Sequence, residues 1–335
     1  MSAAADEAGA APSEYGPDRP ELQVVVVTYD PGAELTTFLD TLRAATRRPC
    51  DVVLADNGST DGTPERAAGR DGVRLLRTGG NLGYGRAANA GAADVRASVT
   101  PAPWLLVANP DIAFTPGSVD VLLDTAAGWP RAGALGPAIL TPDGALYPSA
   151  RALPSLGRGI GHALLGSWWP SNPWTAAYRQ ERGAPVEGPA GWLSGSCLLL
   201  RREAFEAVGG FDPGYFMYFE DVDLCDRLGQ AGWQSVYVPR AVVEHSGGHA
   251  TRRTPRRMLR AHHSSAHRYL ARRYAGPLWV PVRLVLAGGL FARYLLSLAS
   301  RRTAEGAAPT RSASAVAGTT PAVVVDGDRR PQSGA

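Results

Sequence analysis

Hydrophobic runs alternate with helix-like stretches along the first part of the chain. The run LQVVVVT at 22–28 is continuous and rich in β-branched residues, which is typical of a strand buried on both faces. The same pattern predicts further strands at 51–58, 72–77, 103–111 and 132–140, and helices at 31–45, 83–98 and 116–128. Strands that alternate with helices indicate βαβ units. We therefore expect an α/β fold with a mostly parallel, Rossmann-like sheet flanked by helices.

The pattern continues downstream of an interruption. Residues 150–190 are rich in Trp, Pro and Gly and are expected to be irregular. The stretch 190–205 predicts a strand followed by a helix, 220–232 predicts a helix, and 233–239 predicts a strand. Ligands of such sheets bind beyond the carboxyl ends of the strands. Polar residues gather at the ends of three predicted strands: Thr28, Asp30, Asp56, Asn57, Asn109 and Asp111.

The two ends of the chain differ from this pattern. Residues 1–20 and 303–335 are small and polar, so we expect a disordered leader and a disordered tail. The leader has neither the basic nor the apolar region of a signal peptide, which favours a cytoplasmic location. The three cysteines, Cys50, Cys197 and Cys225, share no metal-ligand spacing. This argues against a zinc site or a disulfide framework.

Three short motifs follow predicted strands. DNGSTDGT at 56–63 is either a simple turn or a nucleotide pocket in which Asp56 accepts a hydrogen bond from a pyrimidine. GGNLGYGRAANAG at 79–91 is either a plain helix start or a glycine-rich loop that binds an anion, with Arg86 adding charge. NPD at 109–111 is either an Asn-Pro turn or the site of a divalent metal held by Asp111.

A cluster of carboxylates follows an aromatic stretch at 215–219, YFMYF. Glu220, Asp221 and Asp223 fall in the first turn of a predicted helix, where acids complement the macrodipole. That effect does not account for the aromatic residues. A carboxylate against aromatic rings is partly desolvated, which raises its proton affinity and suits a general base. His245, after a later predicted strand, is either a metal ligand or a structural histidine.

In their order, these motifs resemble glycosyltransferase family 2, the inverting enzymes of the GT-A fold. The resemblance covers about 22–250 and is most specific at 191–233. Within the family, the chain is most similar to the bacterial rhamnosyltransferase branch that uses dTDP-L-rhamnose. The resemblance implies a catalytic domain at 21–250, with a nucleotide-sugar donor half at 21–115 and an acceptor half at 116–250.

The resemblance also implies roles for individual residues. Asp221 matches the catalytic base, with Glu220 beside it. The positions that match donor-binding residues are Thr28, Asp30, Asp56, Asn57, Asn81, Gly83, Arg86 and Asn109. Those expected near the acceptor are Trp192, Ser194 and Gly195. Asp111 and His245 match ligands of Mg²⁺ or Mn²⁺, although Asn109 replaces the first carboxylate of the family's metal motif.

The charge of the chain is unevenly distributed. Residues 251–302 contain twelve Arg and no acid, which leaves 22 Arg against 31 acids elsewhere. Such a segment usually has an anionic partner. Because 278–300 is apolar but interrupted by Arg283 and Arg293, we expect an amphipathic helix on the cytoplasmic membrane surface. The alternative is a helix pair packed on the catalytic domain or in a homodimer. Nucleic-acid binding is disfavoured because no reading motif is present.

The function expected from these features is inverting, metal-dependent transfer of a sugar in cell-wall or polysaccharide biosynthesis. The sugar is expected to be L-rhamnose, and the acceptor a glycan or N-acetylglucosamine on a polyprenyl diphosphate. Two alternatives remain: a family 2 enzyme that uses a UDP- or GDP-linked sugar, or a sugar-nucleotide-binding protein without catalytic activity.

Overall fold

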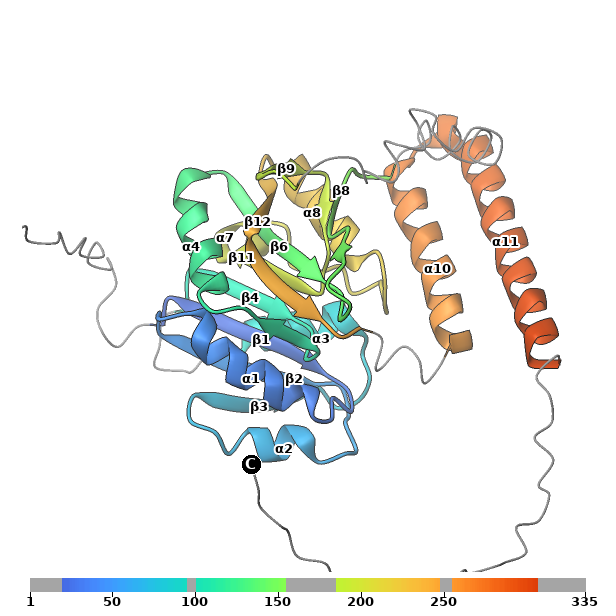
Figure 1. Cartoon of the computed structure of the whole chain (residues 1–335). Helices are drawn as coiled ribbons and strands as arrows, with labels where there is room; N and C mark the ends of the chain where they lie inside the picture. Colours follow the sequence, from blue (N-terminus) through green and yellow to red (C-terminus); the bar gives the residue numbers. More distant parts are fainter. Residues whose placement is uncertain (1–19, 95–100, 155–184, 248–254, 307–335) are drawn as a thin grey trace, which may run out of the picture. The chain divides into compact units, whose positions relative to one another are not determined.

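The computed structural model describes residues 20–94, 101–154, 185–247 and 255–306 (Figure 1). The leader expected at 1–20 and most of the irregular region expected at 150–190 lie outside these ranges. Up to Tyr294 the chain forms one unit, and a second unit begins at Leu295.

A ten-stranded mixed sheet forms the centre of the first unit (Figure 1). Along its main path the strands are β3 (Val73–Arg77), β2 (Cys50–Asp56), β1 (Leu22–Thr28), β4 (Trp104–Ala108), β11 (Cys197–Arg201), β6 (Ala132–Leu140), β12 (Gln234–His245) and β5 (Ile112–Phe114). Strands β3, β2, β1 and β4 are parallel, whereas β11 lies antiparallel between β4 and β6. The expected α/β fold, a mostly parallel sheet flanked by helices, is confirmed.

Short strands extend this sheet and form a second one. β7 (Leu146–Tyr147) pairs with β6, and β9 (Gly188–Ala190) pairs with β12. β8 (Ala150–Arg151) and β10 (Trp192–Leu193) form a separate two-stranded sheet.

Helices cover both faces of the large sheet. One face carries α1 (Glu34–Ala45), α2 (Thr63–Ala67) and α4 (Ser118–Gly128), and the other carries α3 (Tyr84–Ala93), α7 (Arg202–Ala207) and α8 (Glu220–Gln230). Strand β1 shows why its sequence is uniformly apolar. Val24 and Val26 enter the first core while Val25 and Val27 enter the second, so no residue of the strand faces water.

Two further helices follow the sheet, α10 (Pro255–Arg273) and α11 (Val280–Gly306), joined through the 3₁₀ turn Pro277–Trp279. α10 packs on the sheet-bearing part of the first unit, where Tyr269 is buried against Tyr215 and Val222. This packing of α10 is what one helix of the alternative helix pair on the catalytic domain would show. α11 continues to Gly306, past the expected start of the tail at 303, and residues 307–335 lie outside the described ranges.

The 3₁₀ turn and the start of α11 are apolar and exposed. Leu278 is 90% exposed, Val285 75% and Phe291 62%. Within the described ranges, one helical segment, Pro277–Leu295, is long and apolar enough to cross a membrane, judged by length and composition alone.

Candidate active site

A dense polar turn follows the carboxyl ends of β1 and β2. Thr28 and Asp56 are register partners across these strands, and the Thr28 hydroxyl donates to Asp56 Oδ1 over 2.9 Å. The backbone N–H groups of Gly58 and Ser59 donate to the same carboxylate over 3.2–3.3 Å. Asp56 is 1% exposed, so these internal donors fix its orientation. The carboxylate predicted to contact the nucleotide base also builds the turn 56–59.

Asp30 ties the end of β1 to the same turn. Its φ is +48°, in the left-handed region that few non-glycine residues adopt. Asp30 Oδ1 accepts from the Thr60 N–H over 2.6 Å, and the Asp30 N–H donates to Ser59 Oγ over 2.9 Å. The polar residues predicted at the ends of the first two strands therefore form one connected network.

Asn57 joins this network to the glycine-rich loop. Its Nδ2 donates to the Gly83 carbonyl over 3.1 Å, and its Oδ1 accepts from the Leu82 N–H over 3.2 Å. Gly83 has a φ of +90°, and a Cβ there would lie 2.2 Å from the Phe216 carbonyl oxygen. That carbonyl accepts from the Tyr84 N–H over 3.0 Å. Glycine is needed at 83 because two backbone segments meet there.

Two other predicted donor-binding side chains have internal partners as well. Asn81 Oδ1 accepts from the Gly83 N–H over 3.2 Å, which shapes the loop before α3. Arg86 is exposed, and its Nε donates to the Pro213 carbonyl over 2.7 Å. Their contacts with a donor diphosphate stay predictions, and the observed bonds give both residues a role in holding their loops.

Asp111 and His245 lie side by side. Strand β5 pairs with β12 so that Ile112 is the register partner of His245. Asp111 Oδ1 is 3.0 Å from His245 Nε2, and Asn109 Nδ2 is 3.4 Å from the same nitrogen. The sheet register thus brings together the two residues that the sequence suggests as metal ligands.

This pair fits a six-coordinate divalent ion. The 3.0 Å between the Asp111 oxygen and the His245 nitrogen is close to the separation of adjacent ligands around Mg²⁺, whose bonds are roughly 2.1 Å long. The two side chains are 10% and 19% exposed, so a ligand can reach them. Among the described residues, no third His, Cys, Asp or Glu joins the pair. Phosphate oxygens and water would complete such a site, as is usual for Mg²⁺ beside phosphate substrates.

The segment 192–196 crosses the carboxyl edge of the sheet and contacts the proposed base. The Gly195 N–H donates to Asp221 Oδ2 over 2.9 Å, while the Gly195 carbonyl accepts from the Tyr84 hydroxyl over 2.6 Å. The Ser196 carbonyl accepts from the Asn109 N–H over 2.9 Å. The predicted acceptor segment is therefore hydrogen-bonded to Tyr84 of α3, to Asn109 and to Asp221.

Trp192 and Ser194 are held by the residues that follow β7. Trp192 pairs with Arg151 across the small sheet, and the Arg151 Cζ lies 5.8 Å from the Trp192 ring centroid. The Ser194 N–H donates to the Ser149 carbonyl over 2.7 Å. Trp192 is half-buried and Ser194 is buried, so the hydroxyl is less accessible than the indole.

Glu220 and Asp221, the first residues of α8, are adjacent carboxylates that form no ion pair with an Arg among the described residues. Among the described residues, Asp221 accepts from two backbone N–H groups, those of Gly195 over 2.9 Å and Val222 over 2.8 Å. Burial raises the pKa of Asp221 above its ordinary value, while those two N–H groups and the charge of Arg151 oppose the rise. Burial, and next the charge of Asp221, raise the pKa of Glu220 to about 8. Glu220 Oε2 is buried and has no hydrogen-bond donor among the described residues.

The backbone before this pair is strained. Tyr218 and Phe219 both have φ values of +67°. Bulky residues in this region cost roughly 1–3 kcal/mol each and persist only where the surroundings fix them. Here α10 supplies the constraint: the Ser265 hydroxyl donates to the Met217 carbonyl over 2.9 Å, and the Tyr269 ring packs 5.8 Å from that of Phe219.

The next acids of α8 have partners of opposite charge. Asp223 accepts from Arg227 Nε over 2.7 Å and lies 3.5 Å from an Arg272 nitrogen of α10. Asp226 accepts from Arg273 Nη1 over 2.6 Å. The third carboxylate of the cluster is therefore structural. Part of the basic charge at 251–302 has its anionic partner within the same chain.

Two functional neighbours escaped the sequence analysis. Arg151 lies in a two-residue strand, and its charge acts on Asp221. Tyr84 is buried and carries the hydroxyl that holds Gly195. An isolated Arg within a stretch expected to be irregular gives no periodic signal, and Tyr84 resembles an ordinary core residue at the start of a helix.

Comparisons with known proteins now define the class. The family model "Glycosyl transferase family 2" matches residues 23–209, and a second, "Glycosyltransferase like family 2", matches 175–264. The chain belongs to glycosyl transferase family 2 and is a glycosyltransferase, as the sequence analysis expected.

Within this family, the chain is similar in sequence to two rhamnosyltransferases. The N-acetylglucosaminyl-diphospho-decaprenol L-rhamnosyltransferase of Mycobacterium tuberculosis (strain ATCC 25618 / H37Rv) is 57% identical over 286 residues, which cover 83% of this chain and 93% of that protein. The rhamnosyltransferase WbbL of Escherichia coli (strain K12) is 46% identical over 82 residues, covering 24% of this chain and 31% of that protein.

Solved structures of similar fold include sugar transferases with bound Mn²⁺. The mannosyltransferase PcManGT from Pyrobaculum calidifontis, in complex with GDP-Man and Mn²⁺, is 17% identical with a TM-score of 0.49 and covers 87% of this chain and 80% of its own. GalNAc-T7 with UDP, GalNAc and Mn²⁺ is 16% identical, also with a TM-score of 0.49, over 69% of this chain and 44% of its own.

Proposed function

We propose that the protein is an inverting L-rhamnosyltransferase that moves rhamnose from dTDP-L-rhamnose to N-acetylglucosamine on a polyprenyl diphosphate. This reaction would build the linker of the cell wall. The observation that carries the proposal is the 57% identity, over 93% of its length, to the mycobacterial enzyme named for that acceptor and that sugar. The arrangement around Asp221 supplies a mechanism.

Asp221 is the proposed general base. Its carboxylate is held by the N–H groups of Gly195 and Val222, so its orientation is fixed before an acceptor binds. Burial raises its pKa, which strengthens it as a base toward an acceptor hydroxyl. The deprotonated oxygen attacks the anomeric carbon opposite the leaving diphosphate, and a single displacement inverts that centre. No nucleophilic side chain is required.

Glu220 has a different proposed role. With a pKa near 8 it is mostly protonated at neutral pH, so the pair carries one negative charge. A protonated carboxyl without an internal donor can donate a hydrogen bond to the acceptor. Glu220 would then orient the sugar while Asp221 accepts the proton.

Asp111 and His245, with Asn109 beside them, are the residues that would hold a divalent cation. Such an ion supplies charge that stabilises the departing diphosphate. Asn57 and Asn81 fix the shape of the loop before α3 on the donor side, because they accept from the N–H groups of Leu82 and Gly83.

We further propose that the enzyme attaches to the inner face of the cell membrane through α11. The observations behind this are the exposed apolar side chains from Leu278 to Phe291 and the absence of acids from 251–302. A lipid-linked acceptor would be reached from that surface.

The experiment that tests the function is a transfer assay with purified full-length protein, dTDP-L-rhamnose and N-acetylglucosaminyl-diphosphoryl polyprenol in the presence of Mg²⁺ or Mn²⁺. We expect one rhamnose per acceptor, with an inverted anomeric configuration by NMR. A thermal-shift comparison of dTDP-, UDP- and GDP-sugars should show stabilisation by the dTDP-sugar. Selective stabilisation by a UDP- or GDP-sugar would reject the rhamnosyl donor, and donor binding without transfer to any acceptor would favour a non-catalytic binding protein.

A further inference from the structure

The hydroxyl of Tyr84 is connected to the proposed base through a single residue. Tyr84 is the first residue of α3 and is 6% exposed. Its hydroxyl donates to the Gly195 carbonyl over 2.6 Å, and the Gly195 N–H donates to Asp221 Oδ2 over 2.9 Å. The carboxylate of Asp221 is therefore held by a residue that Tyr84 holds in turn.

Gly195 lies so close to Asp221 that its position determines where the carboxylate can lie. A Cβ at residue 195 would be 3.2 Å from the Asp221 Cβ and 3.4 Å from Asp221 Oδ2, which is tighter than an ordinary van der Waals contact. Backbone hydrogen bonds anchor the neighbouring residues Ser194 and Ser196. At Gly195 itself, the carbonyl is anchored by the hydroxyl of Tyr84. This hydrogen bond therefore fixes the residue that orients the base.

Tyr84 also belongs to the donor side of the site. It directly follows the glycine-rich loop, and its N–H donates to the Phe216 carbonyl over 3.0 Å. Its ring packs edge-on against Phe211, with the ring centroids 6.1 Å apart, so the direction of the hydroxyl is fixed by the core. One residue thus connects the end of the glycine-rich loop, the loop before the base and the segment that holds Asp221.

The surroundings of Tyr84 keep its hydroxyl protonated. Burial, and next the charge of Glu220, raise the pKa of Tyr84 well above its ordinary value. The other ionisable groups whose charge acts on Asp221, or which respond to its charge, are Glu220, Arg151 and Cys225. Burial raises the pKa of Cys225 to about 11, so this thiol is neutral as well. Tyr84 therefore acts on the base through hydrogen bonding and not through its own charge.

We propose that Tyr84 is a positioning residue of the transfer reaction: its hydroxyl holds Gly195, which holds Asp221 in the orientation that accepts the acceptor proton. This inference rests on the proposed function, in which Asp221 is the base. Tyr84 itself needs to touch neither substrate. Loss of its hydroxyl should therefore slow proton transfer without weakening donor binding, because a base that is displaced even slightly loses much of its effect.

The test compares Tyr84→Phe with Tyr269→Phe, which also removes a buried tyrosine hydroxyl beside α8. The Tyr269 hydroxyl donates to the structural carboxylate of Asp226 over 3.1 Å. Both variants keep the ring and lose one buried hydrogen bond, so their melting temperatures should fall alike. The kcat of Tyr84→Phe should fall about 10–100-fold, with the KM for dTDP-L-rhamnose unchanged. Tyr269→Phe should keep kcat within a few-fold of the wild type.

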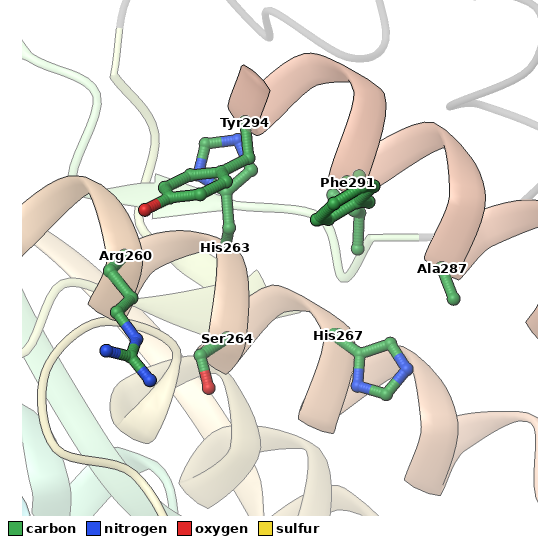
Figure 2. Close-up of a pocket in the computed structure, with 8 residues that line it drawn as sticks. Arg260, His263, Ser264, His267, Ala287, Phe291 and Tyr294 are labelled. Carbon is green, nitrogen blue, oxygen red and sulfur yellow. The ribbon is translucent and has the colours of Figure 1, made fainter. Parts of the chain in front are cut away.

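Tyr294→Phe is a second control, for the loss of a tyrosine hydroxyl outside the base site. Tyr294 lines a cavity of about 230 Å³ between α10 and α11, and the residues that line this cavity include neither Gly195 nor Asp221 (Figure 2). This variant should behave as the wild type in every assay.

The pH dependence of kcat/KM gives a readout that a folding defect does not move. The Gly195 N–H lowers the pKa of Asp221 against the effect of burial. A loosened Gly195 should let that pKa rise, so the acid limb should move to higher pH by about half a unit to one unit in Tyr84→Phe. The limb should stay in place in Tyr269→Phe. The amount of folded protein scales the rate but not its pH dependence, so lower stability cannot imitate the shift.

Two further variants show whether Tyr84 acts through Gly195 and Asp221. Gly195→Ala, whose Cβ would crowd Asp221, should move the acid limb in the same direction as Tyr84→Phe. In the Asp221→Asn background, Tyr84→Phe should lower kcat no further, because the group that it positions no longer takes a proton.

Four results would overturn the inference. Tyr84→Phe keeps the kcat and the acid limb of the wild type; its kcat falls while the limb stays in place; Tyr269→Phe loses as much kcat; or the effects of Tyr84→Phe and Asp221→Asn on kcat multiply. A limb that moves in Gly195→Ala but not in Tyr84→Phe belongs to the second of these, because Gly195 would then orient the base without help from Tyr84.

A measurement without turnover separates this inference from the proposed function. A ¹³C NMR titration of protein labelled at the aspartate carboxyl carbons reports the pKa of Asp221 directly, and Asp221→Asn identifies its resonance. A higher pKa of Asp221 in Tyr84→Phe, in a protein that transfers no rhamnose, would keep the link between the two residues and reject the function. Rhamnosyl transfer with an unchanged pKa and kcat in Tyr84→Phe would do the opposite.

Discussion

Two pairs of acids on α8 serve opposite purposes. Glu220 and Asp221 receive no arginine hydrogen bond among the described residues, and the pKa of each is raised. Asp223 and Asp226 are buried as well but pair with Arg272 and Arg273 of α10. Burial alone therefore does not decide the role of a carboxylate. The supply of counter-charges determines whether it stays a proton acceptor or becomes a structural ion pair.

The largest expected effect comes from removing the proposed base. Asp221→Asn keeps the size of the side chain but cannot take a proton, so kcat should fall about 10²–10⁴-fold. The melting temperature should change little, because a buried charge is lost together with one backbone hydrogen bond. Steady-state transfer rates and thermal denaturation measure the two quantities.

Asp223→Asn is the matched control for that variant, assayed well below its own melting temperature. It removes a more deeply buried carboxylate two residues along the same helix. Its kcat should stay within a few-fold of the wild type. If Asp223→Asn lost as much activity as Asp221→Asn, the assignment of a catalytic role to Asp221 and a structural role to Asp223 would be wrong.

The second effect concerns pH and stability. The pKa of Glu220 is about 8 in the folded protein, against 4.5 ordinarily. Between these values the folded protein holds a proton that the unfolded chain releases, so unfolding becomes easier as pH rises. The stabilisation is complete below pH 4.5 and lost by about pH 8, and it amounts to at most about 5 kcal/mol. Urea unfolding should therefore show that the free energy of unfolding of the wild type, relative to that of Glu220→Gln, is lower at pH 8.5 than at pH 5.5.

The glutamine variant also buries an amide without partners, which adds a constant difference at every pH. Only the change of the gap with pH reports on Glu220. Two parallel stability curves would show that the folded and unfolded proteins bind the same number of protons at this position.

Much of this architecture follows from local sequence. Strands β1 and β6 were predictable because uninterrupted apolar runs must be covered on both faces. The direction of β11 was not, since a short apolar run looks the same in either orientation. The left-handed residues Tyr218 and Phe219 were also unpredictable, because contacts with α10 fix them rather than any local turn preference.

The site was partly predictable for a similar reason. Polar residues at strand ends indicated the donor edge, and acids after aromatic residues indicated the base. Composition showed that 251–302 needed an anionic partner. It could not show that Asp223 and Asp226 of the same chain meet part of that need. Charge counts do not distinguish an internal partner from an external one, so the whole segment 251–302 was expected to meet an external anionic surface.

The third expected effect concerns the ion pairs that Asp223 makes with Arg227 and Arg272. Asp223→Asn leaves the partly buried Arg227 guanidinium without its counter-charge, which should lower the free energy of unfolding by about 3 kcal/mol, because breaking a buried ion pair costs about 3–5 kcal/mol and Arg272 is partly exposed. Arg272→Gln should cost less, about 1 kcal/mol, because its side chain is 46% exposed. Denaturant titrations of the two single variants and the double variant give the coupling between them. A coupling of zero would mean that α10 does not stabilise α8 through this pair.

The smallest expected effect concerns Arg151, the cation whose charge acts on Asp221. Its charge lowers the pKa of Asp221 against the effect of burial. Arg151→Gln should therefore raise that pKa and move the acid limb of kcat/KM to higher pH, by less than about one unit. Arg151→Lys separates charge from stacking: it should restore the limb without restoring the contact with the Trp192 ring. Arg240→Gln, beside α4 on the other face of the sheet, should not move the limb. A limb that moves to lower pH in Arg151→Gln would show that stacking on Trp192, and not charge, is how Arg151 acts on the base.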